Sequence, residues 1–206
     1  MESILTIAQY VYNKYLEKEN YKIDEMKLHK ILYFIQRENF VQKNCCLFEE
    51  DFQGWKYGPV CIEVREKYNQ YKKKKFAIFI DDYSEEKINK ETLNLINTVF
   101  DKYYKKNSWN LSRITHFEYS WNRSRINIKD DENGNVIILK DDIKKDAERI
   151  KKRREYLNSD KNKEKYNYNT IPSIDEDLFD EMEQSNINID SNDINIKLKR
   201  ILKTIQ

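Results

Sequence analysis

Glycine and proline are scarce in this chain, which has three of the first and two of the second among 206 residues. So few backbone breakers exclude a collagen-like chain and a turn-rich sandwich or barrel, and they favour helices. Hydrophobic residues make up 39% of the chain and aromatic residues 13%, so the chain can fill a core and is not wholly disordered. We expect a mainly α fold, a compact multi-helix domain with a short β-hairpin and a helical or flexible C-terminal extension.

Long apolar runs and cysteine pairs are also missing. No apolar run approaches the roughly 20 residues that a membrane span needs. Polar residues interrupt the apolar N-terminal stretch, which therefore predicts a helix rather than a signal peptide. The three cysteines, Cys45, Cys46 and Cys61, form neither a disulfide framework nor a zinc-binding spacing. These features predict reduced thiols, a cytoplasmic location and no membrane association.

The net charge of +2 says little, but its distribution is uneven. Residues 140–165 hold eleven Lys and Arg against seven Asp and Glu, whereas residues 175–193 hold eight acids and no base. The chain is basic again from residue 197 to residue 203. Such alternation is typical of a solvated surface or of a device that steers a partner.

Apolar side chains recur at helical spacing in five stretches of the first 125 residues. The five predicted helices are 3–19, 25–42, 59–72, 84–106 (or from residue 90) and 109–121. Ser3 and Asp24 are suited to cap the first two helices. Pro59 is expected at the first position of the third helix. Residues 44–58 predict a compact aromatic loop or a short extended segment.

The later part of the chain changes character. Asn133-Gly134 between the apolar segments 126–129 and 136–140 predicts a β-hairpin. A basic helix capped by Asp141 or Asp142 should follow. We expect a flexible acidic segment from residue 158 with one short helix around Leu178 and Phe179, and a terminal helix over 194–205. The predicted parts are a helical core at 1–125, a hairpin with a basic amphipathic helix at 126–157, and an acidic flexible segment with a short terminal helix at 158–206.

No pattern of residues predicts catalysis. A nucleophile needs a base within reach, and a pairing of Cys61 with His116 has no local signature. His116 is more typical of a structural histidine that bonds a carboxylate such as Glu118. The acids at 49–51 could bind a divalent cation, but consecutive acids are more typical of a solvated loop. No glycine-rich phosphate-binding motif is present. We therefore predict no enzyme and no catalytic, cofactor-binding or metal site.

Two further patterns bear on partners. The basic helix at 144–154 could contact phosphates, but the acidic stretch at 175–193 would repel nucleic acid, which makes nucleic acid an unfavoured partner. Trp55, Tyr57 and Trp121 lie around or after the Gly-Pro step at 58–59 and form either a buried aromatic cluster or a protein-binding pocket rich in hot-spot residues.

Three blocks in order, KLHKILYFIQ (27–36), LFEEDFQGWKYGPVCIEV (47–64) and LSRITHFEYSW (111–121), resemble the Panacea family of SocA-like, phage-associated antitoxin domains. The resemblance spans about residues 3–125, and the WKYGPV block together with the later TH and Trp block carries it. His29 stands where the family usually has glutamine or a similar polar residue. FEYSW replaces a common acidic-proline-Trp version.

The resemblance implies a helical, non-enzymatic prophage antitoxin that neutralises a cognate protein toxin, such as an alarmone-synthetase-like toxin, by direct binding. It also implies an alternative, an adapter that delivers a client toxin to a Clp protease. A DNA-binding regulator is a third hypothesis. The resemblance names no individual toxin and no oligomeric state.

On this basis we hypothesise that the core presents a surface near the turn at 55–59. The acidic segment would wrap a basic cleft of the toxin in the manner of a polyanion. The predicted partner-binding residues are Trp55, Tyr57, Gly58, Pro59, His116, Trp121, Asp175, Glu176, Asp177 and Phe179.

Overall fold

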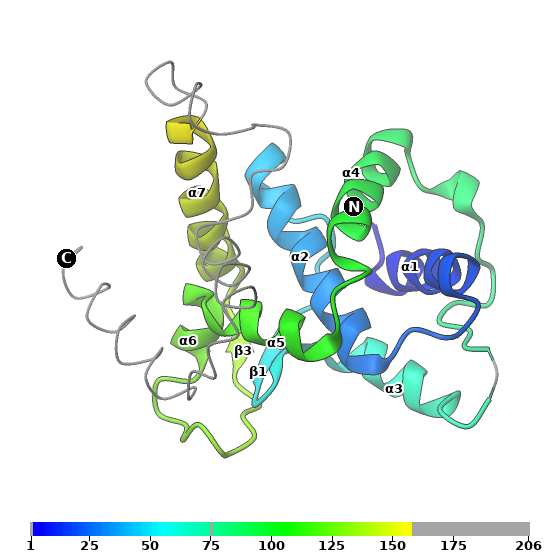
Figure 1. Cartoon of the computed structure of the whole chain (residues 1–206), viewed down its shortest axis with the longest axis horizontal. Helices are drawn as coiled ribbons and strands as arrows, with labels where there is room; N and C mark the ends of the chain where they lie inside the picture. The colour runs from blue at the N-terminus through cyan, green and yellow to red at the C-terminus, as the bar shows by residue number, and fades with distance from the viewer. Residues whose placement is uncertain (1, 75, 158–206) are drawn as a thin grey trace. The chain divides into compact units, whose positions relative to one another are not determined.

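The computed structural model describes residues 2–74 and 76–157 (Figure 1). The flexible acidic segment, the short helix around Leu178 and Phe179 and the terminal helix are predictions that lie outside these residues. The described elements are α1 (Ile4–Glu19), α2 (Glu25–Lys43), β1 (Phe52–Trp55), β2 (Gly58–Cys61), α3 (Ile62–Gln70), the 3-10 turn η1 (Glu85–Lys87), α4 (Lys90–Tyr103), α5 (Ser108–His116), α6 (Tyr119–Ser124), β3 (Ile137–Ile138) and α7 (Lys140–Leu157). The predicted mainly α fold is confirmed, and the fold contains a short β-hairpin, which β1 and β2 form rather than residues 126–140. Among the described residues, no helix combines the length and the apolar character that crossing a membrane requires.

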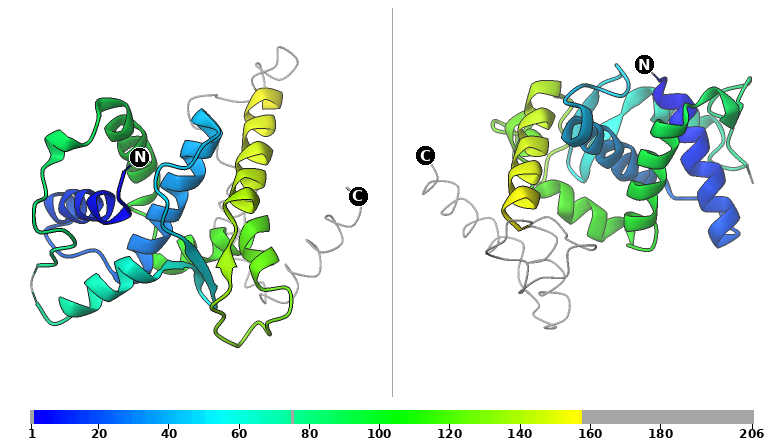
Figure 2. Two further views of the ribbon diagram at one scale, coloured as in Figure 1. Left: turned by 180° about the vertical axis from the view of Figure 1, so that it is seen from behind. Right: turned by 90° about the horizontal axis from the view of Figure 1, so that it is seen from above.

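Helix α2 lies at the centre of the described fold. Every side chain from residue 27 to residue 40 is buried, and α2 packs against α1, α4, α5, α7 and β2 (Figures 1 and 2). Its apolar side chains cover more than one face of the helix, which is the pattern of a helix enclosed by its neighbours. The Asp24 side chain caps its start by accepting from the Lys27 N–H at 2.9 Å, and Asn44 ends it in the left-handed conformation.

The sheet has three antiparallel strands in the order β2-β1-β3. Residues 44–58 therefore include an extended segment, and β1 and β2 form a hairpin in which Trp55 pairs with Gly58. Pro59 lies within β2, and helix α3 begins only at Ile62. The prediction of Pro59 at the first helical position was wrong. An edge strand accepts a proline, because the missing N–H can face away from the ladder.

The prediction of a hairpin around Asn133-Gly134 was also wrong. Residues 126–127 lie in a turn and residue 128 in a bend, and β3 pairs with β1 through Ile138 and Phe52. Neither Asn133 nor Gly134 has the positive φ that a type I′ turn requires.

Close approach to β1 explains the glycine in this loop. A Cβ at Gly134 would lie 2.6 Å from the carbonyl oxygen of Gly54. The Arg125 guanidinium organises the loop by donating to the carbonyls of Gly54, Lys129 and Glu132 at 2.6–2.9 Å.

The predicted helix at 109–121 is two helices, α5 and α6, and the second is capped from a distant part of the chain. Glu118 at the N-cap position of α6 makes no side-chain cap. Instead the Asp146 carboxylate of α7 accepts from the N–H groups of Tyr119 at 2.7 Å and Ser120 at 2.9 Å. These are donors that a helix start leaves unpaired. Helix α7, predicted as a basic helix, is thereby joined to α6.

Charged side chains also join α7 to α2. Arg154 donates two hydrogen bonds to the Glu38 carboxylate, from Nη1 to Oε1 at 2.8 Å and from Nη2 to Oε2 at 2.9 Å. Burial is the largest single influence and opposes ionisation of Glu38, but the hydrogen bonds from Arg154 and Gln42 and the charges of Arg154 and Arg37 together lower the pKa of Glu38. Arg37 pairs with Glu118, and both side chains are buried. Burial and the neighbouring Glu118 raise the pKa of Asp146 well above its usual range.

Removal of the Asp146 carboxylate should destabilise the fold. Asp146→Ala leaves the buried N–H of Ser120 and the partly buried N–H of Tyr119 without their acceptor, and we expect a loss of roughly 2–4 kcal/mol in the free energy of unfolding. Urea denaturation followed by circular dichroism measures it. Glu148→Ala, an exposed position on the same helix, is the control and should change stability by less than about 0.5 kcal/mol. Equal effects of the two substitutions would contradict the proposed capping role.

Candidate partner-binding surface

The turn between β1 and β2 is held by three helices. Three of its backbone carbonyls accept a hydrogen bond from a side chain on α6, α5 and α2, respectively. The pairs are Trp121 Nε1 with the Trp55 carbonyl (2.9 Å), Ser112 Oγ with the Tyr57 carbonyl (2.9 Å) and Lys30 Nζ with the Pro59 carbonyl (3.0 Å). Because each bond comes from a different helix, the turn is fixed in three directions.

Gly58 allows the turn to approach these helices closely. Its φ of +99° lies in the region that side chains rarely adopt. A Cβ at this position would lie 2.3 Å from Thr115 Oγ1 and 2.6 Å from Lys30 Cε. The WKYGP turn therefore depends on glycine for both its backbone conformation and its packing.

Lys30 is a fully buried cation beneath the turn. Burial lowers its pKa to about 7, and the charges of Asp24 and Glu25 offset only part of that effect. Because removing an ammonium group from water is costly, the fold sacrifices stability to hold the Pro59 carbonyl. Sequence reasoning missed this residue, since its spacing on α2 is that of an ordinary helical lysine.

His116 is a packing residue beside the turn. Its ring stacks on Trp121 with centroids 4.1 Å apart and planes 9° apart. Burial, followed by the charges of Lys30 and Arg125, lowers the pKa of His116 to about 4, so the ring is neutral at physiological pH. Trp121 is itself buried, so the stack forms the base on which the turn lies.

The exposed part of this region is aromatic and basic. Tyr57 is 44% exposed and Trp109 is 58% exposed, and their rings meet edge to face with centroids 5.2 Å apart. The Lys56 ammonium lies 5.3 Å from the centre of the Tyr57 ring, and the Arg65 guanidinium lies 4.7 Å from that of Trp55. We call Trp55, Lys56, Tyr57, Arg65 and Trp109 the tip surface. Tyr57 and Trp109 are exposed, and the other three side chains are half-buried. Trp, Tyr and Arg on a rigid base are the residue types that dominate protein-binding hot spots.

The structure brings together the six predicted partner-binding residues that it describes. Tyr57 is exposed, Trp55 and His116 are half-buried, and Gly58, Pro59 and Trp121 are buried. The remaining four, Asp175, Glu176, Asp177 and Phe179, lie outside the described residues.

Trp109 was absent from the predicted set. The buried face of α5 includes Leu111, Ile114 and Thr115, and Trp109 is out of phase with it. That mismatch was the available signal in the sequence, because an apolar side chain off the buried stripe of a helix must face solvent or a partner.

The candidate nucleophile is placed unfavourably for catalysis. Cys61 is buried, and burial raises the pKa of its thiol far above the usual range. The thiol donates to Glu63 Oε2 at 3.1 Å, while His29 Nδ1 accepts from the Cys61 backbone N–H at 3.4 Å. A buried, protonated thiol is unreactive. In the described part of the chain, no three His, Cys, Asp or Glu side chains converge on a metal position.

The buried lysine predicts an unusual pH dependence. The unfolded chain keeps the pKa of Lys30 near 10.5, whereas the folded chain lowers it to about 7, so between these values the unfolded state binds more protons. Lys30 should therefore make the free energy of unfolding rise from pH 7 towards pH 10, and Lys30→Met should remove that rise. Urea unfolding at pH 7 and pH 9 measures it, with the exposed Lys90→Met as control. The same pH dependence in wild type and Lys30→Met would refute the assignment.

Comparison with known proteins finds a similarity that covers this surface. Residues 28–122 match the family model described as "Antitoxin SocA-like, Panacea domain", a narrower span than the predicted 3–125. No curated protein and no solved structure matches the chain. The family is antitoxin-like, which supports a general antitoxin role. The matched residues include the whole tip surface, and this segment is similar to an antitoxin SocA-like Panacea domain.

Proposed function

We propose that this protein is an antitoxin that neutralises a cognate protein toxin by direct binding, with the tip surface as the centre of the interface. The family of residues 28–122 supports the antitoxin role. The observation that carries the choice of surface is the Tyr57–Trp109 pair, two exposed aromatic rings in edge-to-face contact. Soluble proteins rarely expose large aromatic rings together unless the patch binds something.

The way the turn is held suits this role. Its backbone is anchored by Lys30, Ser112 and Trp121, so the aromatic rings are presented with little freedom left to lose. Association then costs less ordering entropy, which is the usual advantage of a preorganised surface. The neutral, stacked His116 adds no charge that would need to be desolvated.

A stable complex needs more area than one turn provides. Specific interfaces bury about 800 Å² on each partner. We propose that the acidic stretch at 175–193 supplies further contacts by wrapping a basic, polyanion-binding cleft of the toxin. Opposite charges on the two partners would also accelerate their encounter.

The arginines of α7 do not favour the alternative of a DNA-binding regulator. Arg154 is bound to Glu38, and Arg149 lies within 4 Å of the carboxylates of Glu118 and Asp146. A phosphate-tracking surface would instead present these cations to solvent. The protease-adapter alternative is separated from direct neutralisation by the toxin level in the experiment below.

Loss of both exposed rings should abolish neutralisation. We expect Tyr57→Ala with Trp109→Ala to weaken binding of the toxin by at least about 100-fold, because each hot-spot truncation costs about 2 kcal/mol or more. The measurement is growth rescue and co-purification on co-expression with the toxic product of the neighbouring gene, with calorimetry for the affinity. Phe76→Ala, which removes an equally exposed ring on another segment, should rescue as wild type does.

Wild-type affinity in the double variant would sink the choice of surface. An immunoblot of the toxin distinguishes direct neutralisation from the protease-adapter alternative. Direct neutralisation leaves the toxin level unchanged, whereas an adapter lowers it in cells that hold an active Clp protease.

The acidic stretch should act mainly on the association rate. Asp175→Asn, Glu176→Gln and Asp177→Asn together should slow association with the toxin by about tenfold and flatten its salt dependence. Stopped-flow mixing at two salt concentrations measures both. The chain contains a matched control with the same residue types, Asp130→Asn, Asp131→Asn and Glu132→Gln, at exposed positions. If both triple variants associate at the wild-type rate, the acidic stretch plays no steering role.

A further inference from the structure

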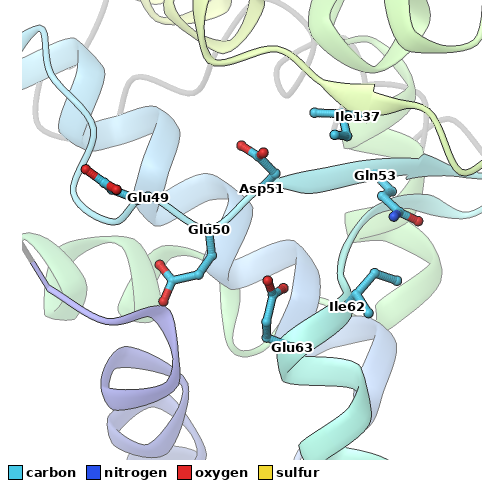
Figure 3. A pocket seen from close by; sticks show the side chains of 7 residues that line it. All are labelled: Glu49, Glu50, Asp51, Gln53, Ile62, Glu63 and Ile137. Atoms are coloured by element: carbon cyan, nitrogen blue, oxygen red, sulfur yellow. The ribbon is translucent and has the colours of Figure 1, made fainter.

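A groove of about 490 Å³ lies over the outer face of the sheet, between β3 and the start of α3 (Figure 3). Its apolar walls are Ile62 and Ile137, and Gln53 forms part of its floor. In strands β1 and β3, Phe52 and Ile138 face the core, while Gln53 and Ile137 pair with each other on the opposite face. We call this hollow the sheet groove.

The described chain leaves this part of the sheet uncovered. Strand β3 is at the edge of the sheet, and Ile137 and the following Leu139 are 47% and 59% exposed. Exposed aliphatic side chains at a sheet edge favour association with another chain.

The charged side chains that line the sheet groove are all negative. Its lining includes four carboxylates and no cationic side chain. Lys140 approaches from outside and binds Asp51 at 2.7 Å, while Glu50 points towards α1, where it accepts from the Ile4 N–H at 3.2 Å (Figure 3). One lysine therefore faces an excess of negative charge.

Glu63 is held in its position beside the apolar walls. It lies in the first turn of α3, where the helix dipole favours the anionic form, and it accepts from the Cys61 thiol. Figure 3 shows its carboxylate directed into the space between Asp51 and Ile62. This arrangement places an anion at the end of an aliphatic wall.

We propose that the sheet groove binds an arginine side chain from an extended, basic segment of a partner protein. The aliphatic stem of an arginine would lie against Ile62 and Ile137, and its guanidinium would reach Glu63. Glu49 lines the same groove and adds negative charge at its outer edge. A divalent cation suits the groove less well, because an ion makes no use of apolar walls and Asp51 is already bound to Lys140.

Continuity with the tip surface favours a protein as the occupant. Trp55 and Gln53 lie two residues apart on the outer face of β1, and Trp55 Nε1 donates to Gln53 Oε1 at 2.9 Å. A partner that contacts the aromatic rings can therefore extend along β1 into the sheet groove. The arginine site rests on the proposed function, because it is a second contact with the same partner.

The test uses the full chain and a synthetic peptide, so that it is independent of the toxin. The probe is the peptide acetyl-Ile-Arg-Ile-Arg-Ile-amide, titrated into the protein and followed by NMR chemical-shift changes. We expect the changes to include Ile137 and Glu63, and affinity to fall with salt. Glu49→Gln with Glu63→Gln should weaken binding at least tenfold, while Asp130→Asn with Asp131→Asn should leave it unchanged.

Three outcomes would overturn the proposal. They are no binding of the arginine peptide, equal binding of the same peptide with glutamine in place of arginine, or equal binding by the Glu49→Gln, Glu63→Gln variant. Because the glutamine peptide is compared with the arginine peptide on wild-type protein, this part of the test does not depend on the variant folding.

A fourth outcome would assign the groove to the chain itself. If the peptide binds only after Lys197, Lys199, Arg200 and Lys203 have all been changed to Gln, the basic stretch at the C-terminal end is the occupant, and the proposal of a partner segment fails. A toxin that still binds in that case leaves the proposed function standing.

Discussion

The polar side chains buried along helix α2 hold the described fold together. An enclosed helix needs only apolar residues to pack, yet α2 directs a different polar group at each neighbour. Lys30 holds the hairpin turn, Gln36 bonds the backbone at residues 47 and 48, Arg37 reaches Glu118 beside α6, and Glu38 receives Arg154 from α7. Apolar contacts tolerate sliding, whereas buried hydrogen bonds are costly to misalign. The polar residues of α2 therefore fix where each surrounding element lies, and the tip surface takes its shape from them.

Periodicity predicted most of the helices, because apolar residues at helical spacing over several turns are seldom found outside a helix with one buried face. Ser3 and Asp24 were predicted as caps, and both cap their helices. Local turn chemistry was a poorer guide. Pro59 and the Asn133-Gly134 pair each have a strong local preference, but pairing with β1 decided the structure around both positions. A signal that spans a few residues cannot report a strand that lies outside it, which is why sheet pairing overrode the local preference.

The sequence predicted which residues lie together at the candidate surface, but not which of them support it and which are exposed. The sequence placed Trp55, Tyr57 and Trp121 in one cluster, and the structure confirms that they lie together. It could not separate rings that support from rings that face solvent, because that depends on which side of the turn α5 and α6 cover. Trp109 was detectable only as an apolar residue out of phase, and Lys30 had no signal at all. Partner binding by these residues stays a prediction.

The capping of α6 by Asp146 has a consequence for how such domains can be exchanged. The residues that match the family end at 122, inside a helix whose first turn is completed from α7. The segment that matches the family therefore ends before the segment that is held together as one folded unit. A chimera between relatives that crosses over at the edge of the matched segment would separate a helix from its cap, whereas a crossover beyond residue 157 would carry the interlocked pair as one module.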